Sequence, residues 1–376
     1  CGPGIPAGLV SGAPQLGAGA VAGTALGLGV GAAAGGRLAM AGGSAAMSAT
    51  GGAVKAASSV AGGASASYNL ARSTSTATGA GGVAGGLWYN GDITSSSTAW
   101  SAVDNFWANM AVTTMAYDPT DDSTFYVGTG EGWYNSDAVR GQGVWKSTDS
   151  GLTWNIIPGT SSSHTSFDSF FDYTNALEVN PVSGNLFIAT TGRIYRYNGV
   201  NLTVELQLPG TSTGLTDVVI TPSGKVYASF DGRTASEGVW TSPTGNGSWT
   251  QIAKNGTPVG WAANGRIVLA EAPSNDGKIY ALYVNGNSGG IEADLWQYNS
   301  LTSTWINYSS KLPDEPGGDK KGNDPFTGQG GYDLVVSVKP DNENFLAIGG
   351  TNVYKIENSY SNYEKRRGLM YVTAPQ

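Results

Sequence analysis

Residues 113–129 read TTMAYDPTDDSTFYVGT, and this phrase decides the fold. An alternating apolar run ends at a proline, a short polar turn follows, and a second apolar run carries aromatic and small residues. Alternation with period two buries one face of a strand, and β-branched and aromatic residues fit the pleated surface. The proline stands where no N–H is needed for strand pairing. The phrase therefore predicts a β-hairpin.

The same phrase recurs along the chain. The later copies are NALEVNPVSGNLFIAT (175–190), DVVITPSGKVYASF (217–230), RIVLAEAPSNDGKIYAL (266–282) and LVVSVKPDNENFLAIGG (334–350). A spacing of roughly 40–70 residues is typical of β-propeller blades, which bury their faces on one another. With a partial unit at 83–103, the pattern predicts an all-β propeller of about six blades over residues 83–376.

The two ends of this propeller are incomplete in different ways. The unit at 83–103 has the length to complete the last blade by pairing with it. After NVYKIEN (352–358) the chain continues as SYSNYEKRRGLMYVTAPQ, without the turn and Trp that end the earlier blades. We therefore expect the last blade to be truncated.

A second phrase follows each hairpin, and its sharpest copy is GVWKSTDSGLTWNII (143–157). Its Asp can accept backbone N–H bonds, its Gly can adopt a positive φ, and its Trp can pack between blades. Degenerate copies of this phrase occur at 87–103, 239–252 and 295–308. The sharp copy matches the Asp-box of bacterial neuraminidase repeats, S-x-D-x-G-x-T-W, at Ser147, Asp149, Gly151, Thr153 and Trp154. The expected role of these residues is structural.

Residues 83–355 resemble large secreted Asp-box proteins of Bacteroidetes, which are labelled glycosyl hydrolase or sortilin-like and often end in a type IX secretion sorting domain. The matching stretches are GGLW (85–88), AVTTMAYDP (111–119), GTGEGWYNSDAVRGQGVWKSTDSG (128–151) and GQGGYDL (328–334). The resemblance implies an extracellular or cell-surface location on a Gram-negative bacterium.

Residues 1–82 have a different composition, rich in Gly, Ala, Ser and Thr. Gly at this density disfavours helix, and few side chains are large enough to offset the entropy of ordering, so we expect a flexible or loosely helical segment. Its wording resembles the Gly/Ala-rich tail of TrbL, a membrane protein of conjugative transfer, which makes a chimera with residues 83–376 one reading and a natural fusion another. Membrane association is expected only through this segment or a lipid-modified Cys1.

Charge limits the partners. The formal net charge is −8, and the first 86 residues contain Arg37, Lys55 and Arg72 but no Asp or Glu, so the acidity belongs to the propeller. A nucleic-acid partner needs a basic face and is therefore not expected. The one cysteine excludes an internal disulfide and a Cys-rich metal site.

The stretch GEGWYNSDAVRGQG (130–143) is an unusually long loop between two strands, and such loops are disproportionately functional. Aromatic rings cover the apolar faces of sugars, and carboxylates accept their hydroxyl groups. The binding candidates are therefore Trp133, Tyr134 and Arg140, and the weak catalytic candidates in this loop are Glu131 and Asp137. The plainer alternative is that Asp137 pairs with Arg140 and orders the loop.

Other carboxylates are candidates for glycoside hydrolysis, which needs two of them about 5–10 Å apart. Asp333 opens an inner strand and can point toward the channel, although capping the start of that strand is the plainer role. Glu271 interrupts an apolar run, where a strand bend is the plainer explanation, and Asp217 is a further candidate. Two comparisons argue against transferring catalytic residues. Sialidases carry an arginine in F/Y-R-I-P, but GRIVL (265–269) lacks the aromatic and the proline. Xyloglucan-cleaving tandem propellers carry a catalytic Asp where GGVAGGLW (81–88) has Ala84 and Gly85.

No cofactor or metal is expected. His164, the one histidine, has no Cys partner for zinc, and a Ser-His-Asp triad with Asp168 or Asp172 lacks a nucleophile-elbow motif. The loop PDEPGGDKKGNDP (313–325) is a candidate for Ca²⁺, but it departs from the EF-hand spacing.

The sequence therefore favours a secreted or surface-attached propeller that binds a glycan or a protein and has no demonstrable catalytic site. The first alternative is a sialidase- or xyloglucanase-like glycoside hydrolase with paired carboxylates at the channel. The second, which rests on residues 1–82, is a membrane component of conjugative transfer.

Overall fold

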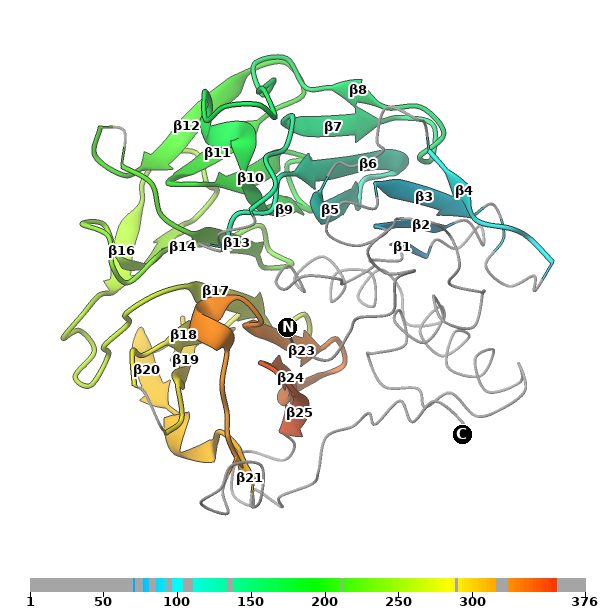
Figure 1. Cartoon of the computed structure of the whole chain (residues 1–376). Helices are drawn as coiled ribbons and strands as arrows, with labels where there is room; N and C mark the ends of the chain where they lie inside the picture. Colours follow the sequence, from blue (N-terminus) through cyan, green and yellow to red (C-terminus); the bar gives the residue numbers. More distant parts are fainter. Residues whose placement is uncertain are drawn as a thin grey trace.

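The computed structural model describes residues 70–71, 77–80, 86–90, 92, 97–103, 111–133, 138–210, 212–287, 290–315 and 324–356. These residues form a β-propeller with five four-stranded blades, followed by one three-stranded sheet (Figure 1). The predicted all-β propeller is confirmed, and the expected number of about six blades agrees approximately. Most of residues 1–82 and all of 357–376 lie outside the described residues, so the TrbL resemblance and the C-terminal tail are not tested.

Every sheet is antiparallel, and its strands follow chain order. In the described residues the first sheet consists of β1 (Leu70–Ala71), β2 (Ala77–Ala80), β3 (Leu87–Asn90) and β4 (Ser101–Ala102), and the second of β5 (Val112–Asp118), β6 (Asp121–Thr129), β7 (Val144–Ser147) and β8 (Asn155–Ile156). The third sheet consists of β9 (Thr174–Val179), β10 (Leu186–Thr190), β11 (Arg193–Tyr197) and β12 (Leu202–Gln207), and the fourth of β13 (Thr216–Ile220), β14 (Val226–Phe230), β15 (Gly238–Ser242) and β16 (Thr250–Ala253). The fifth sheet consists of β17 (Ile267–Glu271), β18 (Lys278–Val284), β19 (Ala293–Asn299) and β20 (Thr304–Asn307), and the sixth of β23 (Val335–Lys339), β24 (Asn342–Gly349) and β25 (Val353–Ile356). A two-stranded sheet of β21 (Asp314–Glu315) and β22 (Asp324–Pro325) lies in the connection to the last sheet.

The quoted hairpin phrases form the first two strands of their sheets, and the first strand lies nearest the centre. Strands β5, β9, β13, β17 and β23 lie side by side around the middle of the molecule (Figure 1). Burial follows this arrangement, because β9 and β10 are buried along their whole length whereas the outer strand β12 is largely exposed. Inner strands covered on both faces read as nearly continuous apolar runs, and outer strands do not.

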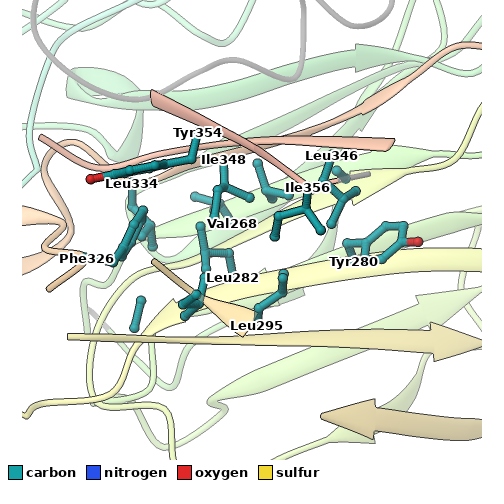
Figure 2. Packing of buried hydrophobic residues seen from close by; sticks show 14 of the residues in the cluster. Val268, Tyr280, Leu282, Leu295, Phe326, Leu334, Leu346, Ile348, Tyr354 and Ile356 are labelled. Carbon is teal, nitrogen blue, oxygen red and sulfur yellow. The ribbon is translucent and has the colours of Figure 1, made fainter. Parts of the chain in front are cut away.

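The core consists of apolar clusters between successive sheets. Figure 2 shows the cluster between the fifth and sixth sheets, in which Val268 and Leu282 pack with Leu346 and Ile348. Burying one such side chain stabilises the fold by about 1.5–3 kcal/mol. A single blade cannot supply this area alone, so each blade depends on its neighbours.

The partial unit at 83–103 has a different role from the one expected. Instead of completing the last blade, its residues form β3 and β4, and β3 pairs with β2, which precedes the expected boundary at residue 83. The N-terminal side of the chain thus supplies strands for its own sheet. The last sheet contains β23, β24 and β25 in the described residues. No helix of the described residues is long and apolar enough to cross a membrane.

One face of the propeller gathers the connections that matter for function. Because the first strands run side by side in the same direction, their starting ends share a face, which we call the top face. The connections from second to third strands, such as 130–143, return to this face. So do the connections that lead into each new sheet, such as 157–173 and 254–266.

Candidate functional site

The centre of the top face is organised by Arg266, which immediately precedes β17. Its side chain is buried, and its guanidinium donates to the carbonyl oxygens of Gly331 at 2.9 Å and Tyr332 at 3.3 Å, just before β23. The guanidinium carbon lies 3.8 Å from the centre of the Trp133 ring, which belongs to the loop 130–143 of the second sheet. Arg266 therefore joins the second, fifth and sixth sheets.

The positive charge of Arg266 acts on two carboxyl groups, those of Asp217 and Asp333. Burial raises the pKa of Asp217 to about 6, although Arg266 and the backbone N–H groups of Leu269 and Val218 lower it. Asp217 Oδ2 accepts the Leu269 N–H at 2.8 Å, which links β13 to β17. Burial also raises the pKa of Asp333, and Arg266 again opposes the shift. A raised pKa is what a general acid needs, but Asp217 Oδ2 is already used by the Leu269 N–H.

The loop 130–143 is held against the third sheet by its backbone. Glu131 and Val139 form a two-way bridge, with N–H to O distances of 2.8 and 2.9 Å. Gly141 N–H donates to the Asp172 carbonyl at 2.8 Å. Gly130 has a φ of 94°, and a Cβ there would meet the Asp172 carbonyl oxygen at 1.8 Å. The loop is therefore built for close backbone approach. Tyr134 and Asp137 lie outside the described residues, so neither the Asp137–Arg140 pair nor their roles are tested.

Beside this loop, three aromatic side chains of the connection 157–173 form a group that we call the aromatic site: Phe167, Phe170 and Tyr173. The Phe167 ring is stacked on Tyr173 at 6.3 Å with an interplanar angle of 30°, and it meets Phe170 edge to face at 6.3 Å. Phe167 is 46% exposed. On the other side, the Arg193 guanidinium carbon lies 3.9 Å from the centre of the Phe170 ring.

A short 3₁₀ helix, η3 (Phe170–Asp172), positions the aromatic site. Ser169 caps it by accepting the Phe171 N–H at 3.1 Å, and Asp172 Oδ2 accepts the N–H groups of Ser169 and Asp168 at 2.9 and 3.0 Å. This capping box satisfies donors that the start of a helix leaves open. Phe171 then points inward against Tyr195, with ring centres 4.5 Å apart. Phe170 and Tyr173 are left half-buried at the surface.

Several buried polar atoms near the aromatic site form no hydrogen bond with another described residue. Within the described residues, the buried atoms without a hydrogen bond include Arg140 Nε, Asp172 Oδ1, Thr174 Oγ1, Thr191 Oγ1 and Arg193 Nε. Buried polar atoms in native proteins nearly always have a partner, so a group of such atoms is a candidate for contact with water or a ligand. Burial raises the pKa of Tyr173, and Arg140 opposes that shift while Asp172 and Glu131 add to it. Arg140 and the Glu131 carboxylate therefore both stand near this ring.

The turn at 147–154 is a hydrogen-bonded unit on the outer rim. Asp149 Oδ1 accepts the Ser147 hydroxyl at 2.8 Å and the Thr153 N–H at 2.8 Å, and Oδ2 accepts the Thr153 hydroxyl at 2.6 Å. Gly151, with a φ of 89°, donates its N–H to Ser147 Oγ, and its carbonyl accepts from Trp154 Nε1 at 3.0 Å. Burial raises the pKa of Asp149, but the hydrogen bonds from Thr153, Ser147 and Leu152 outweigh it and lower the pKa below its usual value.

The remaining candidates have other surroundings. His164 Nδ1 lies 2.9 Å from Gln142 Nε2, and Asp168 Oδ1 accepts the Ser163 N–H at 3.1 Å. Glu271 is buried, and its charge raises the pKa of Tyr117 together with burial and Glu178. The described residues contain no group of three or more His, Cys, Asp or Glu side chains that could hold a metal ion, and most of the loop 313–325 lies outside them.

The structure thus brings some sequence candidates together and separates others. Trp133, Asp333 and Asp217 gather at Arg266, whereas Glu131 and Arg140 lie near Tyr173. Trp133 is only 6% exposed, because Arg266 covers its ring. Sequence reasoning missed the aromatic site. A signal for this site was present in HTSFDSFFDYT (164–174), where three Phe and one Tyr lie close together in a polar loop. The candidates taken from this stretch were instead the histidine and the aspartates.

Comparison with known protein families and with curated proteins finds no match. Among solved structures, the fold is similar to the GH74 xyloglucanase from Xanthomonas campestris, with a TM-score of 0.54 and 17% identity over 77% of this chain and 43% of that one. It is also similar to an ancestral GH74 enzyme, with a TM-score of 0.52 and 14% identity over 78% of this chain and 36% of that one. The chain spans less than half the length of these two enzymes. At such low identity the likeness is one of fold.

Proposed function

We propose that this chain is an extracellular or surface-attached β-propeller that binds a carbohydrate at the aromatic site of its top face. The observation that carries the proposal is the exposed ring of Phe167, which is stacked on Tyr173 and next to Phe170, near polar atoms that form no hydrogen bond with a described residue. Aromatic faces cover the apolar C–H faces of sugars, and such sites combine rings with a few placed polar groups.

The polar groups suit hydroxyl-rich ligands. Arg140 Nε and Arg193 Nε are donors, Asp172 Oδ1 is an acceptor in its ionised form, and the Thr174 and Thr191 hydroxyls serve as either. Sugar hydroxyls also donate and accept, so they match this mixture of donors and acceptors. A protein ligand is the alternative occupant, and it would be expected to cover a larger area of the top face.

A glycoside hydrolase is the second candidate function, favoured by the raised pKa of the half-buried Asp333. The two similar structures are named as GH74 enzymes, and the one from Xanthomonas campestris as a xyloglucanase. In this chain Asp333 would donate the proton, and Glu131 is one of the other carboxylates that the sequence suggests. Such a pair requires a separation of about 5–10 Å.

One experiment separates the two functions. The full chain is tested for binding to a panel of polysaccharides, and the same polysaccharides are assayed for new reducing ends. Binding without cleavage supports the proposed function. Cleavage that is lost in Asp333→Asn and in Glu131→Gln supports the hydrolase. Absence of binding across the panel contradicts the carbohydrate-binding proposal.

A further inference from the structure

The arginines among the described residues fall into two groups. Arg196 pairs with Glu205 at 2.7 Å, and Arg233 pairs with Asp231 at 2.8 Å. Arg266 is held by two carbonyl oxygens and the Trp133 ring. These side chains have their partners within the protein, which is the usual condition for a guanidinium that is removed from water.

Arg193 and Arg140 differ from them. Neither is paired with a carboxylate of a described residue. Arg193 rests on the Phe170 ring and makes one long hydrogen bond, from Nη1 to the Tyr195 hydroxyl at 3.4 Å, while its Nε is buried and has no acceptor. Arg140 Nε is likewise buried without an acceptor. Both guanidinium groups thus retain donors that no described residue satisfies.

Among the described residues, Asp172 has a carboxyl group close to Arg140, but it is poorly suited to neutralise it, and Asp137 lies outside these residues. Asp172 lies close enough for Arg140 to lower its pKa, but burial is the larger effect and raises that pKa above its usual value. The two groups do not form an ion pair. Asp172 Oδ2 is already used by the N–H groups of Asp168 and Ser169.

The two arginines flank the aromatic site. Arg193 belongs to the third sheet and lies against the Phe170 ring, and Arg140 belongs to the loop of the second sheet and is close enough to lower the pKa of Tyr173. We infer that the ligand of the aromatic site is an acidic polysaccharide, in which carboxylates on different sugars of one chain meet Arg193 and Arg140 while a ring between them stacks on Phe167. This inference rests on the proposed carbohydrate-binding function and names the class of sugar.

The chemistry favours a carboxylate over a hydroxyl as the missing partner. A guanidinium presents a planar set of N–H donors that matches a carboxylate with two parallel hydrogen bonds. The chain as a whole is acidic, with a formal net charge of −8, so it repels a polyanion at long range. Recognition must therefore come from the local guanidinium groups. Arg266, which falls nearest the sialidase motif in the sequence, is not among them.

The test uses the full chain with polygalacturonate and with its fully methyl-esterified form, which keeps the backbone and removes the charge. Affinity is measured by calorimetry for the wild type, Arg193→Gln, Arg140→Gln and the control Arg233→Gln, whose arginine already has a carboxylate partner. Losing one charge-assisted hydrogen bond weakens binding by about tenfold or more. We expect the affinity for polygalacturonate to fall by this amount in Arg193→Gln. In Arg140→Gln we expect the affinity to fall as well. The control is expected to stay within about twofold.

The outcomes separate the inference from the function on which it rests. The inference is overturned if the methyl ester binds as tightly as the acid, or if Arg233→Gln weakens binding as much as Arg193→Gln. Binding of neutral polysaccharides that is lost in Phe167→Ala, with no binding of polygalacturonate, keeps the carbohydrate-binding function and removes the acidic class. Absence of binding to every polysaccharide overturns both. Circular dichroism of each variant shows whether it is folded.

Discussion

The guanidinium carbon of Arg266 lies 3.8 Å from the centre of the Trp133 ring, although the two residues belong to the fifth and second sheets. The contact therefore spans the top face instead of joining neighbouring blades. Two further hydrogen bonds from Arg266 reach the segment before β23. The long loop 130–143 is thus tied to the far part of the propeller as well as to the third sheet beside it.

The Arg266–Trp133 contact is expected to contribute measurably to stability. A buried cation–π pair is worth about 0.5–2 kcal/mol. In a double-mutant cycle of Trp133→Leu and Arg266→Met, followed by urea unfolding, the coupling free energy should fall in this range. The single variant Arg266→Met should lose more unfolding free energy than this coupling term, because it also leaves two carbonyl groups without their donor. Additive effects, within about 0.3 kcal/mol, would show that the two side chains do not interact.

The pH dependence of stability should carry the signature of Asp217. Its pKa is raised to about 6 in the folded state, so the folded protein holds this proton more tightly than the unfolded chain does. Its contribution to stability is therefore fully present below the ordinary value near 3.8 and is lost as the pH rises through about 6. Asp217→Asn removes this dependence.

The measurement is the difference in unfolding free energy between the wild type and Asp217→Asn at several pH values from 4 to 7. Other carboxyl groups titrate in the same interval, and taking the difference between the two proteins removes their contribution. The wild type should lose stability relative to the variant as the pH rises. A difference that does not change with pH would mean that burial leaves the Asp217 pKa near its ordinary value.

The rim turn at 147–154 should stabilise its blade through Asp149. Asp149→Ala removes hydrogen bonds from Ser147, Leu152 and Thr153, and the expected loss in unfolding free energy is about 1–2 kcal/mol. The matched control is Thr148→Ala, an exposed neighbour in the same turn. Chemical denaturation compares the two. Equal stability of both variants would argue against a structural role for the carboxylate.

Close backbone approach at Gly130 should be necessary for the site. In Gly130→Ala the new Cβ would meet the Asp172 carbonyl oxygen, so the loop must shift away from η3. We expect weaker saccharide binding and lower thermal stability. The control Gly247→Ala has a similar positive φ but no atom within 4 Å of the new Cβ, so it shares the backbone strain without the clash. Indistinguishable effects of the two substitutions would exclude the clash as the cause.

The sequence predicted the architecture well because the fold depends on local patterns. Alternation, the proline at the end of each first strand and the polar turn are properties of adjacent residues, and they located the hairpins correctly. The pairing of β3 with β2 was not anticipated, because it depends on upstream residues whose Gly- and Ala-rich composition resembles no strand. The extra strands come from a stretch that propensity alone would leave unstructured.

The candidate site was only partly predictable. The loop 130–143 stood out by its length, and Asp333 and Asp217 by their places at the start of inner strands. The partner of Trp133 did not, since Arg266 lies more than a hundred residues away and meets it only once the ring of blades has formed. The contact between Arg193 and Phe170 was not predictable either, because it depends on η3, which turns Phe171 inward and Phe170 outward.

The most direct test of carbohydrate binding at the aromatic site is the affinity of the full chain and its Phe167→Ala variant for polysaccharides that the wild type binds. The control is Leu301→Ala, which removes an even more exposed apolar side chain from a turn of the fifth sheet. Stacking of one sugar on one ring contributes about 1–3 kcal/mol by analogy with other ring stacking. Phe167→Ala should therefore weaken binding about tenfold while Leu301→Ala leaves it unchanged. Full affinity in Phe167→Ala would contradict the account.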